Sequence, residues 1–245
     1  MTNFWEHLFS GKSADEAGKT EAKQAFNVAL AASKIPTLEH YLFSTLPNAT
    51  ELTDGKRGVP HMDHKAGVDE RIKKELPDLA AKTTFIWMGW YSGNMANMYL
   101  IKPIEIPRTG KYIWMQPSRA DAVLPVSGNV TANLGRFAVT ALAHPEKTRG
   151  KYIDVRSNSM TFTDILKVWS EVTGKEAAYV PIEPEAFNKL YGPAGVEMSM
   201  QYQSGELWGD WERIKGDDMV QPGDIGIDQL VDLRGDLELL KDKLL

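Results

Sequence analysis

Short apolar runs alternate along this chain with longer segments that have helical periodicity. The runs Glu39–Leu46 and Thr83–Met88 are rich in aromatic, aliphatic and β-branched residues, a composition that favours buried strands. The segments Glu21–Lys34 and Pro60–Leu76 place apolar residues three and four positions apart, as amphipathic helices do. Strands that alternate with helices of this length form βαβ units, in which helices cover both faces of a parallel sheet. We therefore predict an α/β fold.

The rest of the chain predicts further elements of both kinds. The expected strands are Lys111–Gln116, Lys151–Val155 and Tyr179–Ile182, and the expected helices are Val130–His144, Thr161–Thr173, Pro184–Tyr191 and Asp228–Leu244. Thr161 is a good N-cap for its helix, and Gly174 is a typical signal for the end of it. Residues Gly192–Gly223 are rich in Met, Gln, Trp and Gly and lack a clear period, so we predict no regular element there. Within it, the Met- and Trp-rich stretch Met198–Trp211 fits a flexible lid, a partner surface or a loosely packed surface segment.

Composition argues against several classes of function. The formal net charge is −5 and no basic stripe occurs, which argues against direct binding of nucleic acid through its phosphates. The chain has no cysteine, so it has neither a disulfide nor a thiolate nucleophile. No apolar run approaches the roughly 20 residues that cross a bilayer, and the N-terminus lacks the pattern of a signal peptide. We expect a protein of the cytoplasm, or of the nucleus, that does not enter membranes.

A series of sequence landmarks resembles a known family. In order, they are TNFWE at Thr2–Glu6, EAKQ at Glu21–Gln24, STLPN at Ser44–Asn48, VPHMDHKAGVDERI at Val59–Ile72, MGWYSGNM at Met88–Met95, NLGRFAVTAL at Asn133–Leu142 and GKYIDVRS at Gly150–Ser157. No single motif is decisive, but the ordered series is specific. It resembles the NmrA-like branch of the atypical short-chain dehydrogenases, particularly its fungal members.

The resemblance implies a Rossmann-type parallel sheet with helices on both faces and a smaller α+β C-terminal domain. A partial NAD(P)-binding domain would comprise residues 1–98 and 129–156, and a domain for the substrate or a partner would comprise residues 99–128 and 157–245. The implied function is that of an NAD(P)-dependent oxidoreductase of fungal secondary metabolism, acting on a small organic substrate. The alternatives are a non-catalytic NADP-sensing regulator that acts through a protein partner, and an inactive truncated gene product.

The sequence also departs from the family pattern. In the family, the TNFWE motif follows the fourth strand of the sheet, whereas here it follows Met1 directly. The G-x-x-G-x-x-G turn that lets the backbone approach a pyrophosphate has no counterpart in these residues. We therefore expect an N-terminally truncated member whose binding of NADP, or of NAD, is weakened or lost. The strand Glu39–Leu46 would then lie at an unprotected sheet edge, and such edges favour homo-oligomers.

The resemblance carries the site residues over by position. The Tyr-x-x-x-Lys pair of ordinary short-chain dehydrogenases falls on His61 and Lys65, so these are the expected catalytic residues. Lys65 would hold the nicotinamide ribose, and His61 would donate a proton, because histidine can act as a general acid near neutral pH. The expected cofactor contacts are Thr2, Asn3, Lys23, Thr45, Leu46, Lys65, Gly89, Trp90, Tyr91 and Ser92.

These residues also have purely structural interpretations. Lys65 on a charged helix can be an ordinary solvated lysine, and His61 at a helix start can make a structural hydrogen bond. His61 and His64 stand three residues apart with Asp63 between them, which could suggest metal ligands. The few other histidines are distant in sequence, so no metal site is expected. Aromatic residues such as Trp87, Trp90 and Tyr91 more often belong to the core or to a pocket wall than to the chemistry of a site.

Overall fold

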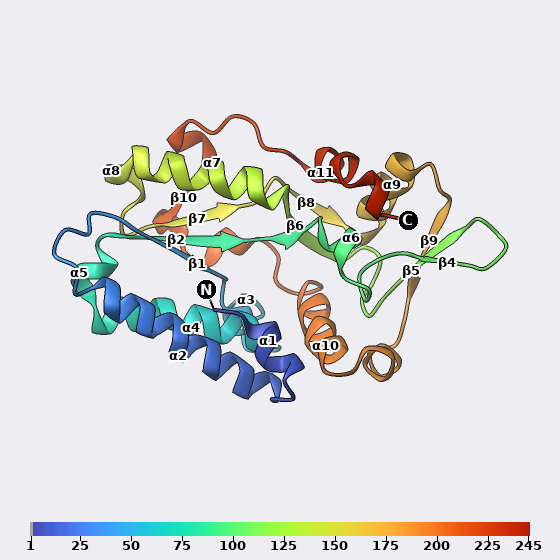
Figure 1. Cartoon of the computed structure of the whole chain (residues 1–245), viewed down its shortest axis with the longest axis horizontal. Helices are drawn as coiled ribbons and strands as arrows, with labels where there is room; N and C mark the ends of the chain where they lie inside the picture. The colour runs from blue at the N-terminus through green and yellow to red at the C-terminus, as the bar shows by residue number, and fades with distance from the viewer. Residues whose placement is uncertain (1) are drawn as a thin grey trace. The chain divides into compact units, whose positions relative to one another are not determined.

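The structure is a computed structural model that describes residues 2–245, and it divides into two compact units (Figure 1). Unit 1 comprises the chain up to Met88 together with Phe137–Asp154 and Leu207–Asp228. Unit 2 comprises Gly89–Arg136, Val155–Glu206 and Gln229–Leu245. Within residues 2–245, none of the helices has the length and apolar character needed to cross a bilayer. The predicted division into a cofactor domain and a substrate domain stays a prediction.

Unit 1 is built on a four-stranded sheet. Its strands lie in the order β1 (Tyr41–Thr45), β2 (Thr83–Met88), β7 (Tyr152–Val155) and β10 (Met219–Val220). β1 runs parallel to β2, and β7 runs parallel to β10. Every residue of β2 is buried, as its run of β-branched, aliphatic and aromatic residues predicts. The predicted α/β fold with a parallel sheet is therefore confirmed.

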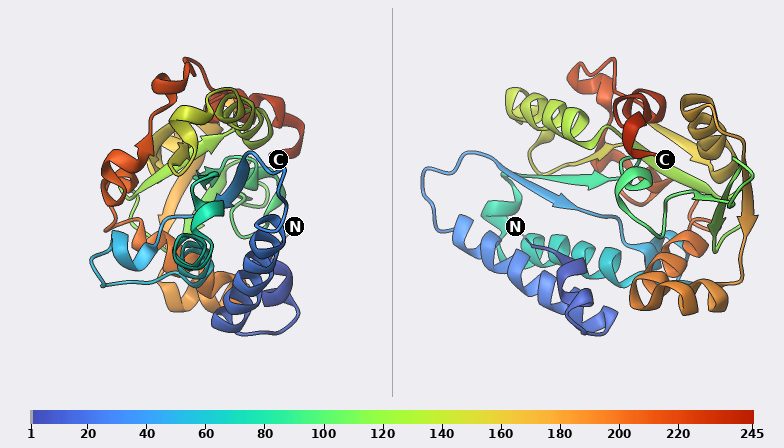
Figure 2. Two further views of the ribbon diagram at one scale, coloured as in Figure 1. Left: turned by 90° about the vertical axis from the view of Figure 1, so that its left-hand side faces the viewer. Right: turned by 45° about the vertical axis from the view of Figure 1, so that its right-hand side comes forward.

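Two long helices, α2 (Ala14–Ala32) and α4 (Pro60–Glu75), lie side by side along one face of this sheet (Figures 1 and 2). They pack closely because Gly18 has no side chain: a Cβ there would overlap the ring of His64. α2 begins earlier than predicted, because Ser13 forms a capping box with the residue three positions later. The other face of the sheet carries the C-terminal part of α7 (Val130–Ala143; Figure 1).

Short helices complete unit 1, and their bounds are α1 Phe4–Phe9, α3 Ala49–Leu52, α5 Pro77–Ala80, α8 Pro145–Thr148, η1 Trp211–Ile214, η2 Gly216–Asp218 and η3 Pro222–Ile225. α7 spans Val130–Ala143. Several of these elements begin with a proline at the first helical position, where its missing N–H leaves no intrahelical bond unmade.

Unit 2 holds two small three-stranded sheets. The first has the order β3 (Trp90–Tyr91), β6 (Val123–Gly128) and β8 (Asn158–Thr161), and the second has the order β4 (Ile104–Glu105), β5 (Tyr112–Gln116) and β9 (Ala177–Pro181). Its helices are α6 Asn94–Asn97, α9 Phe162–Thr173, α10 Pro184–Ser204, α11 Leu233–Leu239 and η4 Lys241–Lys243. α9 begins and ends as predicted, with Thr161 as N-cap and Gly174 in the left-handed conformation.

Two predictions for unit 2 were wrong. Residues Gly192–Ser204, for which no regular element was predicted, are helical, because α10 resumes after a break at Gly192 and buries Ala194, Met198 and Tyr202 at a spacing of one helical turn. The closing helix predicted at Asp228–Leu244 is much shorter. It starts only at Leu233, where the Asp232 side chain accepts a hydrogen bond from the Gly235 amide.

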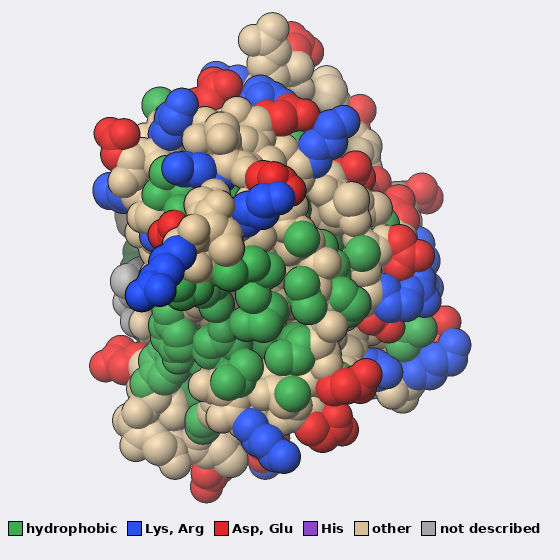
Figure 3. Space-filling view, turned by 90° about the vertical axis from the view of Figure 1, so that its right-hand side faces the viewer, with side chains coloured by type: hydrophobic (Ala, Val, Ile, Leu, Met, Phe, Trp, Pro, Cys, Tyr) green, Lys and Arg blue, Asp and Glu red, His purple; other side chains and the backbone are tan. Residues whose placement is uncertain are grey.

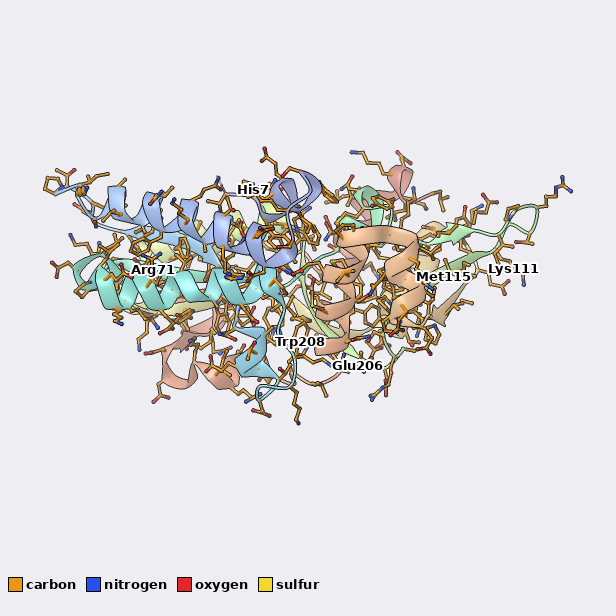
Figure 4. All side chains as sticks on the ribbon, turned by 90° about the horizontal axis from the view of Figure 1, so that it is seen from below. His7, Arg71, Lys111, Met115, Glu206 and Trp208 are labelled. Atoms are coloured by element: carbon orange, nitrogen blue, oxygen red, sulfur yellow. The ribbon has the colours of Figure 1, made fainter. Side chains whose placement is uncertain are left out.

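One face of the second sheet of unit 2 is apolar, and we call it the β4-β5-β9 face. Strand pairing places Ile104, Ile113 and Ala178 in one row, and Met115 and Val180 in the next. The space-filling view from this side shows hydrophobic side chains gathered together (Figure 3). Charge lies at one end of the sheet, where Lys111 forms an ion pair of 2.9 Å with Glu176, away from Met115 (Figure 4).

Candidate functional site

A buried carboxylate brings two of the predicted site residues together in unit 1. The Lys65 Nζ atom lies 3.2 Å from Oε1 of Glu21, and the Thr2 hydroxyl donates a hydrogen bond of 3.2 Å to the same oxygen. Glu21 is only 3% exposed, so the pair lies largely out of water. We call Thr2, Glu21 and Lys65 the Glu21 cluster.

The packing of α2 on α4 creates the Glu21 cluster. Glu21 stands on the buried row of α2, one turn from Ala17 and one turn from Ala25, and Lys65 faces it from α4. Asn3 caps α1 by accepting hydrogen bonds from the Trp5 and Glu6 amides at 3.1 and 3.4 Å, and so fixes the chain next to Thr2. The Lys65 side chain keeps 25% of its surface exposed, and an ammonium group has three donors.

The second predicted catalytic residue, His61, lies one turn before Lys65 on the same face of α4. Its ring is buried against Phe4 and Trp5 of α1, with centroid separations of 5.6 and 5.8 Å. His64 instead contacts Asp15 at 2.9 Å. The two histidines thus make different contacts, and in the part of the chain that the structure describes no three His, Cys, Asp or Glu side chains gather as metal ligands.

The end of β1 contributes Thr45, which is buried and whose hydroxyl donates to the Lys65 carbonyl oxygen at 3.4 Å. Leu46 follows it and is half-buried. Lys23 is exposed and stands two residues beyond Glu21, which places it on a different side of α2. The structure therefore brings Thr45 next to α4 but does not bring Lys23 into the Glu21 cluster.

The predicted contacts Gly89–Ser92 belong to unit 2 and are engaged within it. The Gly89 amide donates to the Ser127 hydroxyl at 2.8 Å, and the Trp90 indole donates to the Tyr202 hydroxyl at 3.1 Å. Ser92 is fully buried, and its hydroxyl contacts the Asp236 carboxylate and the Gly128 carbonyl. The predicted role of these residues toward a cofactor stays a prediction.

Sequence reasoning missed Glu21, although a signal was present. The family resemblance carried over Lys23 from the EAKQ motif and did not mark Glu21. Glu21, however, continues the row formed by Ala17, Ala25 and Ala29, all of which are buried. An acidic residue in a row of buried alanines indicates a carboxylate with a partner, because charges are rarely buried alone.

A second buried acid, Asp69, lies one turn beyond Lys65 on α4 and is 2% exposed. Burial raises its pKa well above the ordinary value for an aspartate, and a hydrogen bond from Thr45 and the charges of Lys215 and Lys73 only partly oppose this shift. The two lysine ammonium groups lie 4.9 and 4.6 Å from the ring centre of Tyr152.

Comparison with known proteins identifies similar chains. A model of the NmrA-like family matches residues 8–235. An NmrA-like family domain-containing protein of Dictyostelium discoideum is 26% identical over 185 residues, which are 74% of this chain and 58% of that protein. An NmrA-like family domain-containing oxidoreductase of Aspergillus hancockii is 24% identical over 156 residues, which are 60% of this chain and 44% of that protein.

A solved structure agrees with the fold. The crystal structure of NmrA, a negative transcriptional regulator, in complex with NADP matches this chain with a TM-score of 0.62 at 20% sequence identity. The match covers 92% of this chain and 67% of the other. The chain spans about half the length of the curated relatives that it matches in sequence.

Proposed function

Because the chain belongs to the NmrA-like family, we propose that it is an NAD(P)-dependent oxidoreductase that acts on a small organic substrate in fungal secondary metabolism. The similarity to a protein named as an oxidoreductase in Aspergillus hancockii supports this proposal. The observation that carries it is the Glu21 cluster, which holds the Lys65 ammonium, while the Lys65 backbone carbonyl accepts a hydrogen bond from Thr45 at the end of β1. Ligands of open α/β sheets bind at the carboxyl ends of the strands, so this is the expected place for a dinucleotide.

The residues present fit the nicotinamide ribose. Glu21 accepts one of the three N–H donors of Lys65, and the exposed part of the side chain leaves the others for ribose hydroxyls. Thr45 lies against the backbone of Lys65 and fixes this turn of α4. A nicotinamide cofactor would supply or accept a hydride when bound. His61, one turn before Lys65, would provide the proton that a reduced carbonyl oxygen needs.

The phosphates of the cofactor lack a comparable cradle. The 245-residue chain itself contains no strand, G-x-x-G-x-x-G turn and helix in succession. The backbone N–H groups of such a turn normally bind the pyrophosphate. We therefore propose that this chain binds NADP or NAD more weakly than a protein that contains the motif.

Replacement of Lys65 by methionine tests the proposed function. We expect Lys65→Met to weaken NADPH binding by roughly 10- to 100-fold, because a charge-assisted hydrogen bond contributes about 1.5–3 kcal/mol. NADPH affinity is measured by fluorescence titration, and turnover is followed by NADPH oxidation with a panel of ketones, imines and quinones. Lys74→Met is the matched control, since Lys74 is exposed on the same helix. Equal affinities for the wild type and Lys65→Met would contradict the proposed site.

The second candidate function is a non-catalytic NADP sensor that acts through a protein partner. The β4-β5-β9 face favours it, since large exposed apolar patches commonly mark interaction surfaces. Exposed residues of unit 2 such as Tyr99 and Leu190, at 62% and 61%, add further apolar surface. NADPH binding without turnover on any substrate would support this candidate over the enzyme. The absence of both binding and turnover would support an inactive gene product.

We also propose that the chain forms homo-oligomers through β1. β1 lies at the end of the strand order among residues 2–245. The Tyr41 amide donates a hydrogen bond of 2.9 Å to the Lys82 carbonyl, so the backbone groups of Tyr41 point toward β2. Successive residues of a strand direct their backbone N–H and C=O groups to opposite sides, so those of Leu42 and Ser44 point toward the open edge. A row of unpaired N–H and C=O groups is a template for a strand of another copy.

A lysine on this edge should prevent the association. We expect the wild-type chain to show a mass above that of the monomer by light scattering at high concentration, and Ser44→Lys to shift it toward the monomer, because lysine on an edge strand blocks pairing. Ser44 is exposed, so the variant should fold. Asn27→Lys, on the exposed side of α2, is the control with the same change in charge. A monomeric wild type at every concentration would refute the proposed oligomer.

A further inference from the structure

A hollow of about 450 Å³ opens in unit 1 where the strands of its sheet begin. It is lined by the loop Pro36–Glu39, which precedes β1, by Lys82, which precedes β2, and by Arg149, which precedes β7. Thr45 and the Glu21 cluster, by contrast, lie where β1 ends. The hollow is therefore separate from the proposed nicotinamide site.

The first cation of the hollow is Arg149. Its side chain is half-buried, and its Nε atom is shielded from solvent without a hydrogen-bond acceptor. Among the residues described, no carboxylate forms an ion pair with its guanidinium group, whereas Arg71 and Arg234 are each bound to a glutamate. The positive charge of this half-buried guanidinium group is thus not balanced by a carboxylate, so an anion from a ligand would be favourable here.

The second cation of the hollow is held in place by the loop. Lys82 Nζ donates to the Leu38 carbonyl oxygen at 3.0 Å and is half-buried. The acid of the hollow, Glu39, is exposed, and within residues 2–245 it forms no ion pair with Lys82 or with Arg149. The hollow thus contains two cations, of which one is fixed and the other lacks a partner.

We propose that this hollow binds the phosphate group of a small ligand, with Arg149 as the main contact and Lys82 as a second charge. The planar guanidinium fork presents parallel N–H donors that match two phosphate oxygens, which makes arginine the preferred residue for such recognition. The open form of the hollow suits either inorganic phosphate or a phosphate monoester. The inference does not depend on the proposed oxidoreductase function, because it uses none of the same residues.

His40 directly follows the loop Pro36–Glu39, and the charge of Arg149 acts on it, so it supplies an internal reporter of binding. The Thr84 hydroxyl donates to the Thr148 carbonyl at 2.8 Å, so in its 2.7 Å contact with His40 Nε2 it acts as the acceptor. Burial, followed by the positive charge of Arg149, lowers the pKa of His40. An anion bound at Arg149 would offset that charge and raise the His40 pKa, with Lys82 and Glu39 as the other charged groups that line the hollow.

The experiment measures binding of inorganic phosphate and of glycerol phosphate to the full chain by calorimetry. We expect millimolar or tighter binding of at least one of them, and we expect Arg149→Gln to weaken it by about tenfold or more. Lys167→Gln, at an exposed position on α9, is the charge-matched control and should bind as the wild type does. Preference for glycerol phosphate would assign the site to a monoester, and equal affinity would assign it to the phosphate group alone.

The His40 titration gives an independent readout by NMR of its ring protons. Phosphate should move the midpoint to higher pH in the wild type and in Lys65→Met, but not in Arg149→Gln. NADPH should bind Arg149→Gln as tightly as it binds the wild type. The phosphate proposal and the proposed nicotinamide site can therefore fail independently of each other. Equal phosphate affinity of Arg149→Gln and the wild type, or an unmoved His40 midpoint in saturated wild-type protein, would overturn the inference.

Discussion

Replacement of Gly128 by alanine should lower the free energy of unfolding by roughly 2–5 kcal/mol. Gly128 ends β6 with a φ of +64°, a conformation that costs side-chain-bearing residues about 1–2 kcal/mol. A Cβ at this position would also overlap the carbonyl oxygen of Val231. That oxygen accepts hydrogen bonds from the Asn129 amide at 3.1 Å and from the Asn133 side chain at 2.9 Å. The segment that carries Val231 must therefore move, and these bonds must weaken.

The measurement is urea-induced unfolding followed by tryptophan fluorescence. Gly110→Ala is the matched control, because Gly110 lies in the same unit with a φ of +69° and no described atom within 4 Å of an added Cβ. The control should therefore show only the conformational cost, about 1–2 kcal/mol. A similar loss in the two variants would mean that the approach of Val231 to Gly128 contributes nothing to stability.

The fold could be predicted where local signals suffice. β2 has the predicted bounds because its short run of β-branched, aliphatic and aromatic residues favours a buried strand. The ends of α9 were predicted because Thr161 caps its start and Gly174 ends it. β6 was missed because Pro125 interrupts its apolar pattern, and because its partners, β3 and β8, are distant in sequence. Strand pairing of this kind depends on tertiary contacts that no window of sequence contains.

In the candidate site, too, local sequence signals indicate some residues, whereas others depend on tertiary contacts. Lys65 could be predicted because a family motif marks its position. The partner of Lys65 could not, since Glu21 belongs to a different helix and is aligned by helix packing alone. The predicted role of Ser92 toward a cofactor stays a prediction, and the contact of its hydroxyl with Asp236, a residue 144 positions away, could not be seen in the sequence. Arg149 was not selected because the lack of a partner is a property of the folded chain.

The largest pH-dependent effect is expected at Asp69. Burial raises the pKa of this carboxyl group well above its ordinary value, so the folded chain keeps a proton that the unfolded chain has already lost. Between the ordinary aspartate pKa and the raised value, the folded state binds more protons than the unfolded state. Stability must then fall as the pH rises, with a slope that approaches about 1.4 kcal/mol per pH unit. Below the ordinary pKa both states are protonated, and the contribution is constant.

Asp69→Asn removes this titration. We expect the wild type to lose stability relative to Asp69→Asn as the pH is raised above about 4, and we expect the difference between them to be constant below about pH 4. Urea unfolding at a series of pH values measures the difference, and Asp78→Asn, at an exposed position, provides a control that should show no such trend. The positive charges of Lys73 and Lys215 favour the charged form of Asp69, so they limit the amount by which burial raises its pKa. If the difference in unfolding free energy between the wild type and Asp69→Asn did not depend on pH, the pKa of Asp69 would not be raised in the folded state. The two lysines would then stabilise its carboxylate as well as water does.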